Sequence, residues 1–147
     1  MIAIGCDHGG YELKQKILAH LRQRGLEYRD FGCDSTASVD YPVYGKAVAH
    51  AVASGECEKG IVICSTGIGI SIAANKVPSI RCALCGDCFS AKATRLHNNA
   101  NVLALLWARW SPDPAWRWKS WTSSWTRLSR RRSVTAVGYP SWRKNNV

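Results

Sequence analysis

Tryptophan is absent from the first 106 residues of this 147-residue chain, and cysteine is absent after position 88. All seven tryptophans lie from Trp107 onward, and all seven cysteines lie from Cys6 to Cys88. Acidic residues are also scarce near the end, because residues 106–147 hold one acid against nine Lys and Arg, whereas residues 1–105 hold nine acids against 11. The formal net charge of +10 therefore belongs to the tail, and it does not mark the rest of the chain as a nucleic-acid-binding domain.

Long hydrophobic runs are missing as well. No segment approaches the roughly 20 apolar residues that cross a bilayer, and no basic leader followed by an apolar run stands at the N-terminus. We therefore expect neither a membrane anchor nor a signal peptide. The odd number of cysteines lacks the pattern of a small secreted domain, so free thiols in a reducing cytoplasm fit better.

Strand-like and helix-like segments alternate through residues 1–105. Short apolar runs predict strands at 2–6, 60–64, 80–85 and 101–105, with a weaker one at 26–32. Apolar periodicity and glycine stops predict helices near 11–25, 43–55, 69–76 and 87–98. This order predicts an α/β fold, a three-layer α/β/α sandwich with a five-stranded parallel sheet. Residues 106–147 show no helical or strand period, and we assign them to a divergent, irregular Trp/Arg-rich tail.

The stretch "CSTGIG", Cys64 to Gly69, stands between an apolar strand and a helix. Its two glycines let the backbone approach a ligand, and the helix N-terminus favours a phosphate or a developing oxyanion. It lacks the Gly-Lys-Ser/Thr ending of a Walker loop and the third glycine of the dinucleotide fingerprint. Cys64 occupies a position where a thiolate is favoured. The alternatives are a plain tight turn and a buried core cysteine.

Polar residues that suit proton transfer or anion binding follow other strands and helices. Asp7 and His8 follow the first strand, and His97 and Asn98 close the helix before the last strand. We expect all four near the carboxyl edge of the sheet, where such folds bind ligands, or on loops that adjoin it. The alternatives are a capping aspartate with a surface histidine, and a histidine that only meets the helix dipole.

A possible metal motif, C-x2-C-x2-C, is formed by Cys82, Cys85 and Cys88. A closed metal site usually needs four ligands. No fourth ligand is obvious, and the first two cysteines would point to opposite faces of a strand. We therefore expect no metal and no other cofactor.

With "GCDHGG", "DYPVYG", "GIVICSTGIGISIAANK" and "RLHNNANVLAL" in place, residues 1–105 closely resemble the type B ribose-5-phosphate isomerases, a family that includes the galactose-6-phosphate isomerase subunits. The resemblance implies a Rossmann-like sandwich, a homodimer with sites at the subunit interface, no metal, and interconversion of ribose 5-phosphate and ribulose 5-phosphate through an enediolate. It implies that Cys64 is the base, that His97 opens the sugar ring, and that Thr66 assists. The implied substrate-binding residues are Asp7, His8, Tyr41, Ser65, Gly67, Ile68, Gly69 and Asn98.

Some relatives lack this cysteine and use a glutamate in the glycine loop. Here position 70 is Ile70, so the resemblance implies the cysteine mechanism. Aldose–ketose isomerisation needs one base that serves two carbons, together with donors aimed at the enediolate oxygens. The resemblance assigns the base to Cys64 and the donors to residues Ser65 to Gly69.

The tail departs from the family, which continues after "NVLAL" with Gly-Ala/Ser-Arg-Val-Val and a basic segment that contacts phosphate. We hypothesise a frameshift near Leu106, because back-translation of residues 133–144 in another phase allows a family-like "GHRRGIPKLEK". The phosphate-binding arginines would then be missing, and we do not assign that role to Arg130, Arg131 or Arg132.

Three alternatives to a ribose-5-phosphate isomerase remain open. One is an isomerase of galactose 6-phosphate or allose 6-phosphate, and another is an inactive frameshifted relative. The third is a non-catalytic protein whose tail binds membrane or nucleic acid, since Arg and Trp together can stack and neutralise phosphates. The tail lacks an amphipathic period, so we expect a sugar-phosphate ligand and neither a membrane nor a nucleic-acid partner.

Overall fold

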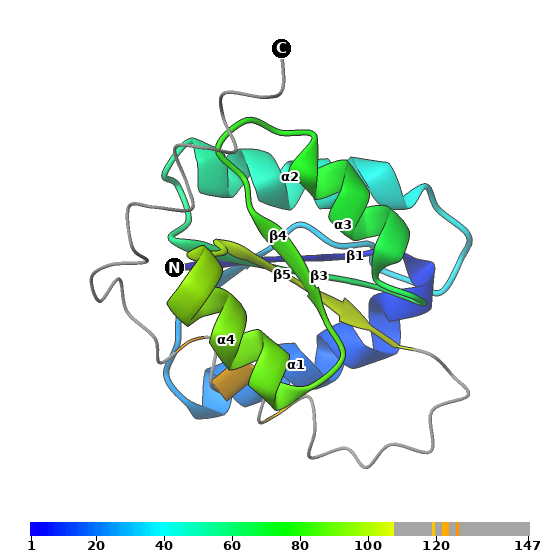
Figure 1. Cartoon of the computed structure of the whole chain (residues 1–147). Coiled ribbons are helices and arrows are strands. Elements are labelled where there is room, and N and C mark those ends of the chain that lie inside the picture. The colour runs from blue at the N-terminus through cyan, green and yellow to red at the C-terminus, as the bar shows by residue number, and fades with distance from the viewer. Residues whose placement is uncertain (108–118, 120–121, 124–125, 127–147) are drawn as a thin grey trace.

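The computed structural model describes residues 1–107, 119, 122–123 and 126. Its centre is a sheet of five parallel strands in the order β2-β1-β3-β5-β4 (Figure 1). The strands are β1 (Ile2–Cys6), β2 (Tyr28–Asp30), β3 (Lys59–Cys64), β4 (Cys82–Cys85) and β5 (Val102–Leu106). The predicted α/β sandwich with a five-stranded parallel sheet is confirmed.

Helices cover both faces of this sheet. A short 3-10 turn, η1 (His8–Gly10), leads into α1 (Tyr11–Gln23), and it is followed along the chain by α2 (Tyr41–Ala53), α3 (Ile68–Asn75) and α4 (Cys88–Asn98). Helices α1 and α4 lie on one face, and α2 and α3 lie on the other (Figure 1). Each helix returns the chain to the start of the next strand, so all five strands end at the same edge.

Two apolar cores follow from the alternation of side chains along the strands. Ile4, Ile61 and Leu103 pack with the buried face of α1, whereas Ala3, Val62 and Ala104 pack with α2 and α3. Burying one aliphatic side chain of this kind contributes about 2 kcal/mol. The central strands β1, β3 and β5 are buried on both faces, which is why they read as continuous apolar runs.

The cysteines of the C-x2-C-x2-C motif divide between these two cores. Cys85 belongs to the core under α1 and α4, and Cys82 packs against the core under α2 and α3. The prediction that they point to opposite faces of a strand is confirmed. The sheet itself therefore separates two of the three sulfurs that a shared metal ion would need.

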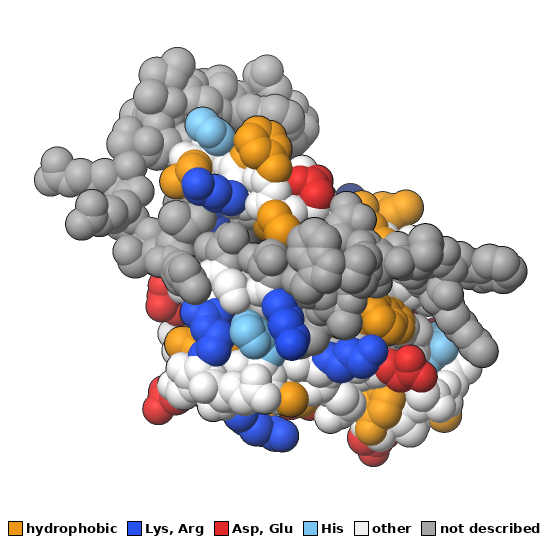
Figure 2. All heavy atoms as spheres, turned by 90° about the horizontal axis from the view of Figure 1, so that it is seen from below, with side chains coloured by type: hydrophobic (Ala, Val, Ile, Leu, Met, Phe, Trp, Pro, Cys, Tyr) orange, Lys and Arg blue, Asp and Glu red, His pale blue; other side chains and the backbone are white. Residues whose placement is uncertain are grey.

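The predicted tail falls mostly outside the described residues. Beyond Leu106 and Trp107, its described members are Lys119, Thr122, Ser123 and Thr126, which are helical and share the spacing of one helix face. Ser123 Oγ lies 3.2 Å from His20 Nε2, and Thr126 Oγ1 accepts a hydrogen bond of 2.7 Å from Arg24. The contact with His20 places Ser123 beside α1. Figure 2 shows this side of the molecule, where Lys, Arg and His side chains lie next to one another.

Within the part of the chain that the structure describes, no helix has the length and apolarity needed to cross a membrane.

Candidate active site

The loop between β3 and α3 brings a backbone N–H group to the sulfur of Cys64. Gly67 donates its backbone N–H to Cys64 Sγ at 2.9 Å. Gly67 has a φ of 72°, in the left-handed region that favours glycine, and this conformation turns the chain from the strand into α3. The site therefore joins a nearly buried thiol, 5% exposed, to a helix N-terminus that favours negative charge.

Thr66 and Ile68 complete the turn. Thr66 is exposed, and its Oγ1 accepts a hydrogen bond of 3.3 Å from the N–H of Ile68, the first residue of α3. Gly67 at the N-cap has no side chain to accept further N–H groups of the first turn. The arrangement can receive an oxyanion next to Cys64.

The loop after β1 meets the glycine loop, residues 64–69, at the same edge of the sheet. Asp7 donates its backbone N–H to the Ile63 carbonyl at 3.3 Å. Gly9 lies against Ser65, because a Cβ added to Gly9 would collide with Ser65 Oγ. The structure thus brings Asp7 and Ser65 together, as expected.

The carboxylate of Asp7 is nearly buried, 6% exposed, and it closes the η1 turn by accepting a hydrogen bond of 3.0 Å from Gly10 N–H. Burial raises the pKa of this carboxyl above its usual value, and the hydrogen bond from Gly10 and the nearby His8 oppose that rise. The carboxylate is therefore an ordered acceptor that keeps part of its capacity for another donor.

The imidazole of His8 is held by the backbone of a distant segment. Its Nδ1 lies 3.1 Å from the backbone N of Val39 and accepts that N–H. A neutral ring that accepts at Nδ1 carries its proton on Nε2, so Nε2 is the donor available to a ligand. Sequence reasoning missed Val39, because a backbone donor leaves no signature in residue type.

Tyr41, the first residue of α2, lies over the glycine loop. A Cβ added to Gly69 would lie 2.7 Å from Cζ of the Tyr41 ring. Tyr41 is 41% exposed, so part of the side chain contacts Gly69 while the residue remains accessible. The structure therefore places Tyr41 against Gly69 in the first turn of α3, and the pocket-lining role that the resemblance implies stays a prediction.

His97 and Asn98 correct one prediction. They close α4, which runs back to the start of β5, and Thr94 and Arg81 accept the backbone N–H groups of Ala100 and Asn101 there. This is the amino edge of the sheet, and Cys64 ends β3 at the opposite edge. Five residues of strand separate the two edges, on the order of 15 Å. The expectation that His97 and Asn98 lie near the carboxyl edge is wrong within a single chain.

A cavity of about 730 Å³ opens at that amino edge, with Lys59, Arg81, Arg95, Asn99 and Asn101 among its lining residues. Arg95 and Asn99 flank His97 and Asn98 along the chain, which supports the placement of this end of α4. The cavity does not contain Cys64 or the glycine loop. It therefore belongs to a different part of the molecule from the candidate active site.

Two residues beyond the predicted domain boundary also lie at the carboxyl edge. Leu106 is the register partner of Cys64 in the sheet, and Trp107 donates its backbone N–H to the Cys64 carbonyl at 3.0 Å. The Trp107 ring packs under the ammonium of Lys16, 4.7 Å from the ring centroid. Both residues were assigned to the tail on sequence alone, without a connection to the site.

Comparison with known proteins gives the same answer as these motifs. The sequence model described as Ribose/Galactose Isomerase matches residues 2–126. The chain is 54% identical over 105 residues to the putative sugar phosphate isomerase YwlF of Bacillus subtilis, covering 71% of this chain and 70% of that protein. It is 54% identical over 104 residues to ribose-5-phosphate isomerase B of Escherichia coli, with the same coverage.

A galactose-6-phosphate isomerase subunit, LacB of Clostridium acetobutylicum, is 44% identical over 105 residues, covering 71% of this chain and 61% of that protein. Among solved structures, ribose-5-phosphate isomerase B of Clostridium thermocellum superposes with a TM-score of 0.83 and 48% identity, over 90% of this chain and 87% of that one. The chain belongs to the ribose/galactose isomerase family.

Proposed function

We propose that this chain is a ribose-5-phosphate isomerase that interconverts ribose 5-phosphate and ribulose 5-phosphate through an enediolate. The observation that carries the proposal is the hydrogen bond of Gly67 N–H to Cys64 Sγ, beside the N-terminus of α3 and at the same edge as Asp7 and His8. Similarity to ribose-5-phosphate isomerases B supports the five-carbon substrate. Sugar-phosphate isomerisation is the chemistry of the family.

Cys64 is the base in this proposal. Its thiolate removes the proton from C2 of the open-chain aldose, and the resulting thiol returns a proton to C1. Between the two steps, negative charge develops on the enediolate oxygens. The N-terminus of α3 beside Cys64 favours that charge, and Thr66 adds a hydroxyl. One base can serve both carbons because they are neighbours in the substrate.

Asp7 and His8 hold the substrate. The buried carboxylate of Asp7 accepts a hydrogen bond from a sugar hydroxyl, and Nε2–H of His8 donates a hydrogen bond to the phosphate. Tyr41 closes the pocket over Gly69. These contacts use groups that the fold has already fixed, which reduces the ordering cost of binding.

The second copy in a homodimer supplies His97 and Asn98. Within one chain, α4 keeps His97 away from Cys64, which supports a ring-opening acid/base supplied by another chain. Large apolar side chains on α3, β4 and α4 stand exposed, which supports their burial by a second copy; they are Ile68, Ile72, Leu84, Phe89 and Leu96. A reducing cytoplasm fits the seven cysteines, all thiols within the described residues.

The direct test is turnover of ribose 5-phosphate by the purified chain, with Cys64→Ala and Cys57→Ala alongside. Both cysteines are buried, but Cys57 lies at the amino edge, so its loss should leave turnover near wild type. Removal of the base should lower kcat by about 10³-fold or more. Wild-type turnover in Cys64→Ala would refute the assigned base.

The second candidate substrate is a six-carbon sugar phosphate, which the similarity to the galactose-6-phosphate isomerase subunit favours. Parallel assays with galactose 6-phosphate and allose 6-phosphate decide between the sugars. A larger kcat/KM on either one than on ribose 5-phosphate would replace the five-carbon assignment.

The frameshift near Leu106 remains a proposal about the tail, residues 106–147, and it makes an inactive chain the third candidate. Sequencing of the coding DNA tests it. A reading frame that continues after Leu105 with Gly-Ala/Ser-Arg and ends in a basic segment supports the frameshift. No family-like continuation in either alternative frame would eliminate it.

A further inference from the structure

Lys14 is an unusual residue for its position in the molecule. It lies on the core-facing side of α1 among Leu13, Ile17 and Leu21, and it is only 2% exposed. A buried ammonium is costly unless it is paired and hydrogen-bonded. A leucine at this position would pack without that requirement, so the partners of Lys14 point to a role beyond packing.

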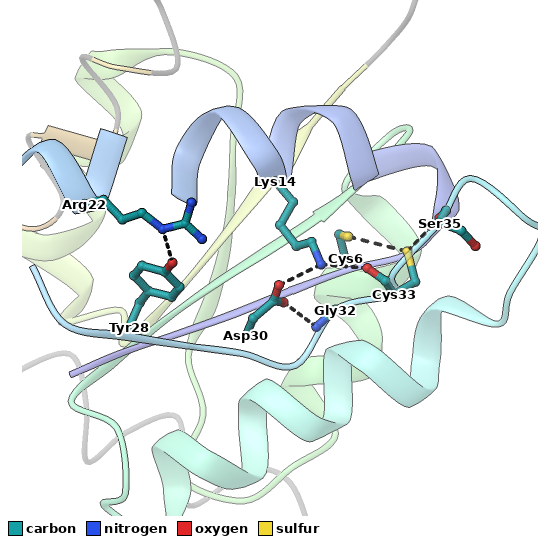
Figure 3. A network of polar contacts seen from close by, with 8 residues as sticks. All are labelled: Cys6, Lys14, Arg22, Tyr28, Asp30, Gly32, Cys33 and Ser35. Carbon is teal, nitrogen blue, oxygen red and sulfur yellow. Dashed lines mark hydrogen bonds and ion pairs between the residues drawn. The ribbon is translucent and has the colours of Figure 1, made fainter. Parts of the chain in front are cut away.

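Two polar partners of Lys14 lie at the end of β2 and just beyond it: Asp30 is the last residue of the strand, and Cys33 belongs to the segment that follows (Figure 3). Its Nζ donates to the Cys33 carbonyl at 2.6 Å and forms an ion pair of 2.8 Å with Asp30 Oδ2. The other carboxylate oxygen, Asp30 Oδ1, accepts the N–H of Gly32 at 2.8 Å. Lys14 thus fastens residues 30–33 to α1.

The same segment is fastened to β1 by backbone hydrogen bonds. Phe31 N–H donates to the Ile4 carbonyl at 2.7 Å, and Cys33 N–H donates to the Cys6 carbonyl at 3.1 Å. Gly32 is packed so closely that an added Cβ would lie 2.8 Å from the backbone N of Cys6 and 2.9 Å from Lys14 Cδ. The position of Cys33 is therefore fixed relative to the last residue of β1.

Six residues after Cys33, the segment reaches the site. Val39 N–H donates to His8 Nδ1 at 3.1 Å, and His8 lies two residues beyond Cys6 and six residues before Lys14. The contacts form a closed ring that runs from His8 along α1 to Lys14, across to Cys33, and back through residues 34–39 to His8. The donor to the His8 imidazole therefore belongs to the same segment that Lys14 holds.

We propose that Lys14, with Asp30, is a positioning residue of the isomerase: it fixes the segment 30–39 so that Val39 N–H holds His8 with its Nε2–H directed to the substrate. Lys14 is buried and does not itself reach a ligand in the site, so it acts only through His8. The effect on substrate binding rests on the proposed function, whereas the effect on the imidazole does not.

The test compares Lys14→Met with Arg22→Met. Met keeps the length and apolar packing of the lysine stem and removes the ammonium. Arg22 also joins α1 to β2, through a hydrogen bond of 2.6 Å from its Nε to the Tyr28 hydroxyl, but it does not touch the segment that leads to His8 (Figure 3). Arg22→Met therefore serves as the control: it removes a contact between α1 and β2 but keeps the hydrogen bond from Lys14 to the Cys33 carbonyl.

The first readout is nitrogen NMR of the histidine rings in the substrate-free protein, with His8→Gln to assign His8 among the four histidines. Wild type and Arg22→Met should show His8 in the Nε2–H tautomer with a hydrogen-bonded Nδ1. Lys14→Met should show a mixture of tautomers. A purely structural role for Lys14 would lower stability and leave these signals unchanged.

The second readout is steady-state kinetics on ribose 5-phosphate. Loss of an oriented donor to the phosphate should raise KM about tenfold in Lys14→Met, with kcat within about twofold of wild type. Arg22→Met should change neither. If wild type does not turn over ribose 5-phosphate, the proposed function fails, and the NMR comparison still decides the role of Lys14.

A folded Lys14→Met protein with the wild-type His8 tautomer overturns the proposal. If Lys14→Met does not fold, Asp30→Asn takes its place, because Asp30 is about one-third exposed and its loss leaves the Lys14 bond to Cys33. Asp30→Asn should shift the His8 signals in the same direction by a smaller amount. Unchanged His8 signals in folded Asp30→Asn would overturn the proposal equally.

Discussion

The ring of Tyr41 lies directly over Gly69, so that a Cβ at position 69 would sit 2.7 Å from Tyr41 Cζ and 3.1 Å from its hydroxyl oxygen. Gly69→Ala should therefore displace the ring. Because the obstacle is the far end of a half-exposed side chain, the unfolding free energy should change by less than about 1 kcal/mol. The pocket should change more, with kcat/KM for ribose 5-phosphate falling about tenfold.

Tyr41→Ala in the Gly69→Ala background gives the matched control. If the ring is the obstacle, the effects of the two substitutions on kcat/KM will not add. The double variant will then have the same kcat/KM as Tyr41→Ala alone. Strict additivity of the two effects on kcat/KM would contradict the contact as the cause.

Gly67 combines a left-handed backbone with close packing. An added Cβ would collide with Leu84 and lie 3.1 Å from the carbonyl oxygen of Leu105. Gly55 has a similar φ, 83° against 72°, but nothing lies within 4 Å of its added Cβ. Gly55→Ala should thus show the backbone cost alone, about 1 kcal/mol, and Gly67→Ala should cost about 2 kcal/mol more.

Urea unfolding of the two variants measures this difference. Gly67→Ala should also lose turnover, because the N–H that reaches Cys64 Sγ would move, whereas Gly55→Ala should keep it. Equal destabilisation by both substitutions would mean that the loop tolerates a side chain at position 67.

The strands and helices could be predicted because the sheet is buried on both faces. A short, continuous apolar run such as Ile61 to Cys64, bounded by polar residues and glycine, is typical of a central parallel strand, and the helices between the strands have clear stops. The carboxyl-edge rule then placed Asp7 and Cys64 together. These parts of the site depend only on the order of elements.

The misplacement of His97 was avoidable on the same rule. A helix that connects two parallel strands runs antiparallel to them, so its last residues must lie at the amino edge. The ring of contacts around His8 was not predictable in this way. It depends on the backbone N–H of Val39 and on a lysine whose helical position looks like a core position filled by the wrong residue type.

We expect the buried carboxylate of Asp7 to lower the stability of the protein at neutral pH while it improves substrate binding. Burial raises the pKa of its carboxyl above the ordinary 3.8, so the folded state holds that proton more tightly than the unfolded chain does. The stability of the wild type therefore falls as pH rises from the ordinary value through the raised one. Asp7→Asn keeps a good cap for η1 and removes the buried charge.

Asp7→Asn should consequently be more stable than wild type at pH 7, with a difference that shrinks as the pH falls toward 4. Its turnover should drop, because an amide accepts a sugar hydroxyl less strongly than a carboxylate does. Thermal unfolding from pH 4 to 8 measures the first effect, with Asp34→Asn, at an exposed position, as control. A constant difference across that range would contradict the assigned cause.

The separation of His97 from Cys64 predicts complementation between two inactive chains. Cys64→Ala lacks the base and His97→Asn lacks the proposed ring-opening group, so each homodimer should be inactive. In a mixed dimer with shared sites, one site contains the wild-type Cys64 of one chain and the wild-type His97 of the other. Random mixing makes half of the dimers mixed, so about a quarter of wild-type activity should return.

A site formed within one chain predicts the opposite result, because every site in the mixture would then lack one of the two groups. The control pairs Cys64→Ala with the double variant Cys64→Ala/His97→Asn, which can form mixed dimers but no complete site. Native mass spectrometry of the mixture shows whether mixed dimers are present. Activity absent despite mixed dimers would mean that His97 does not serve a partner's Cys64, and the ring-opening group would have to come from the carboxyl edge of the same chain.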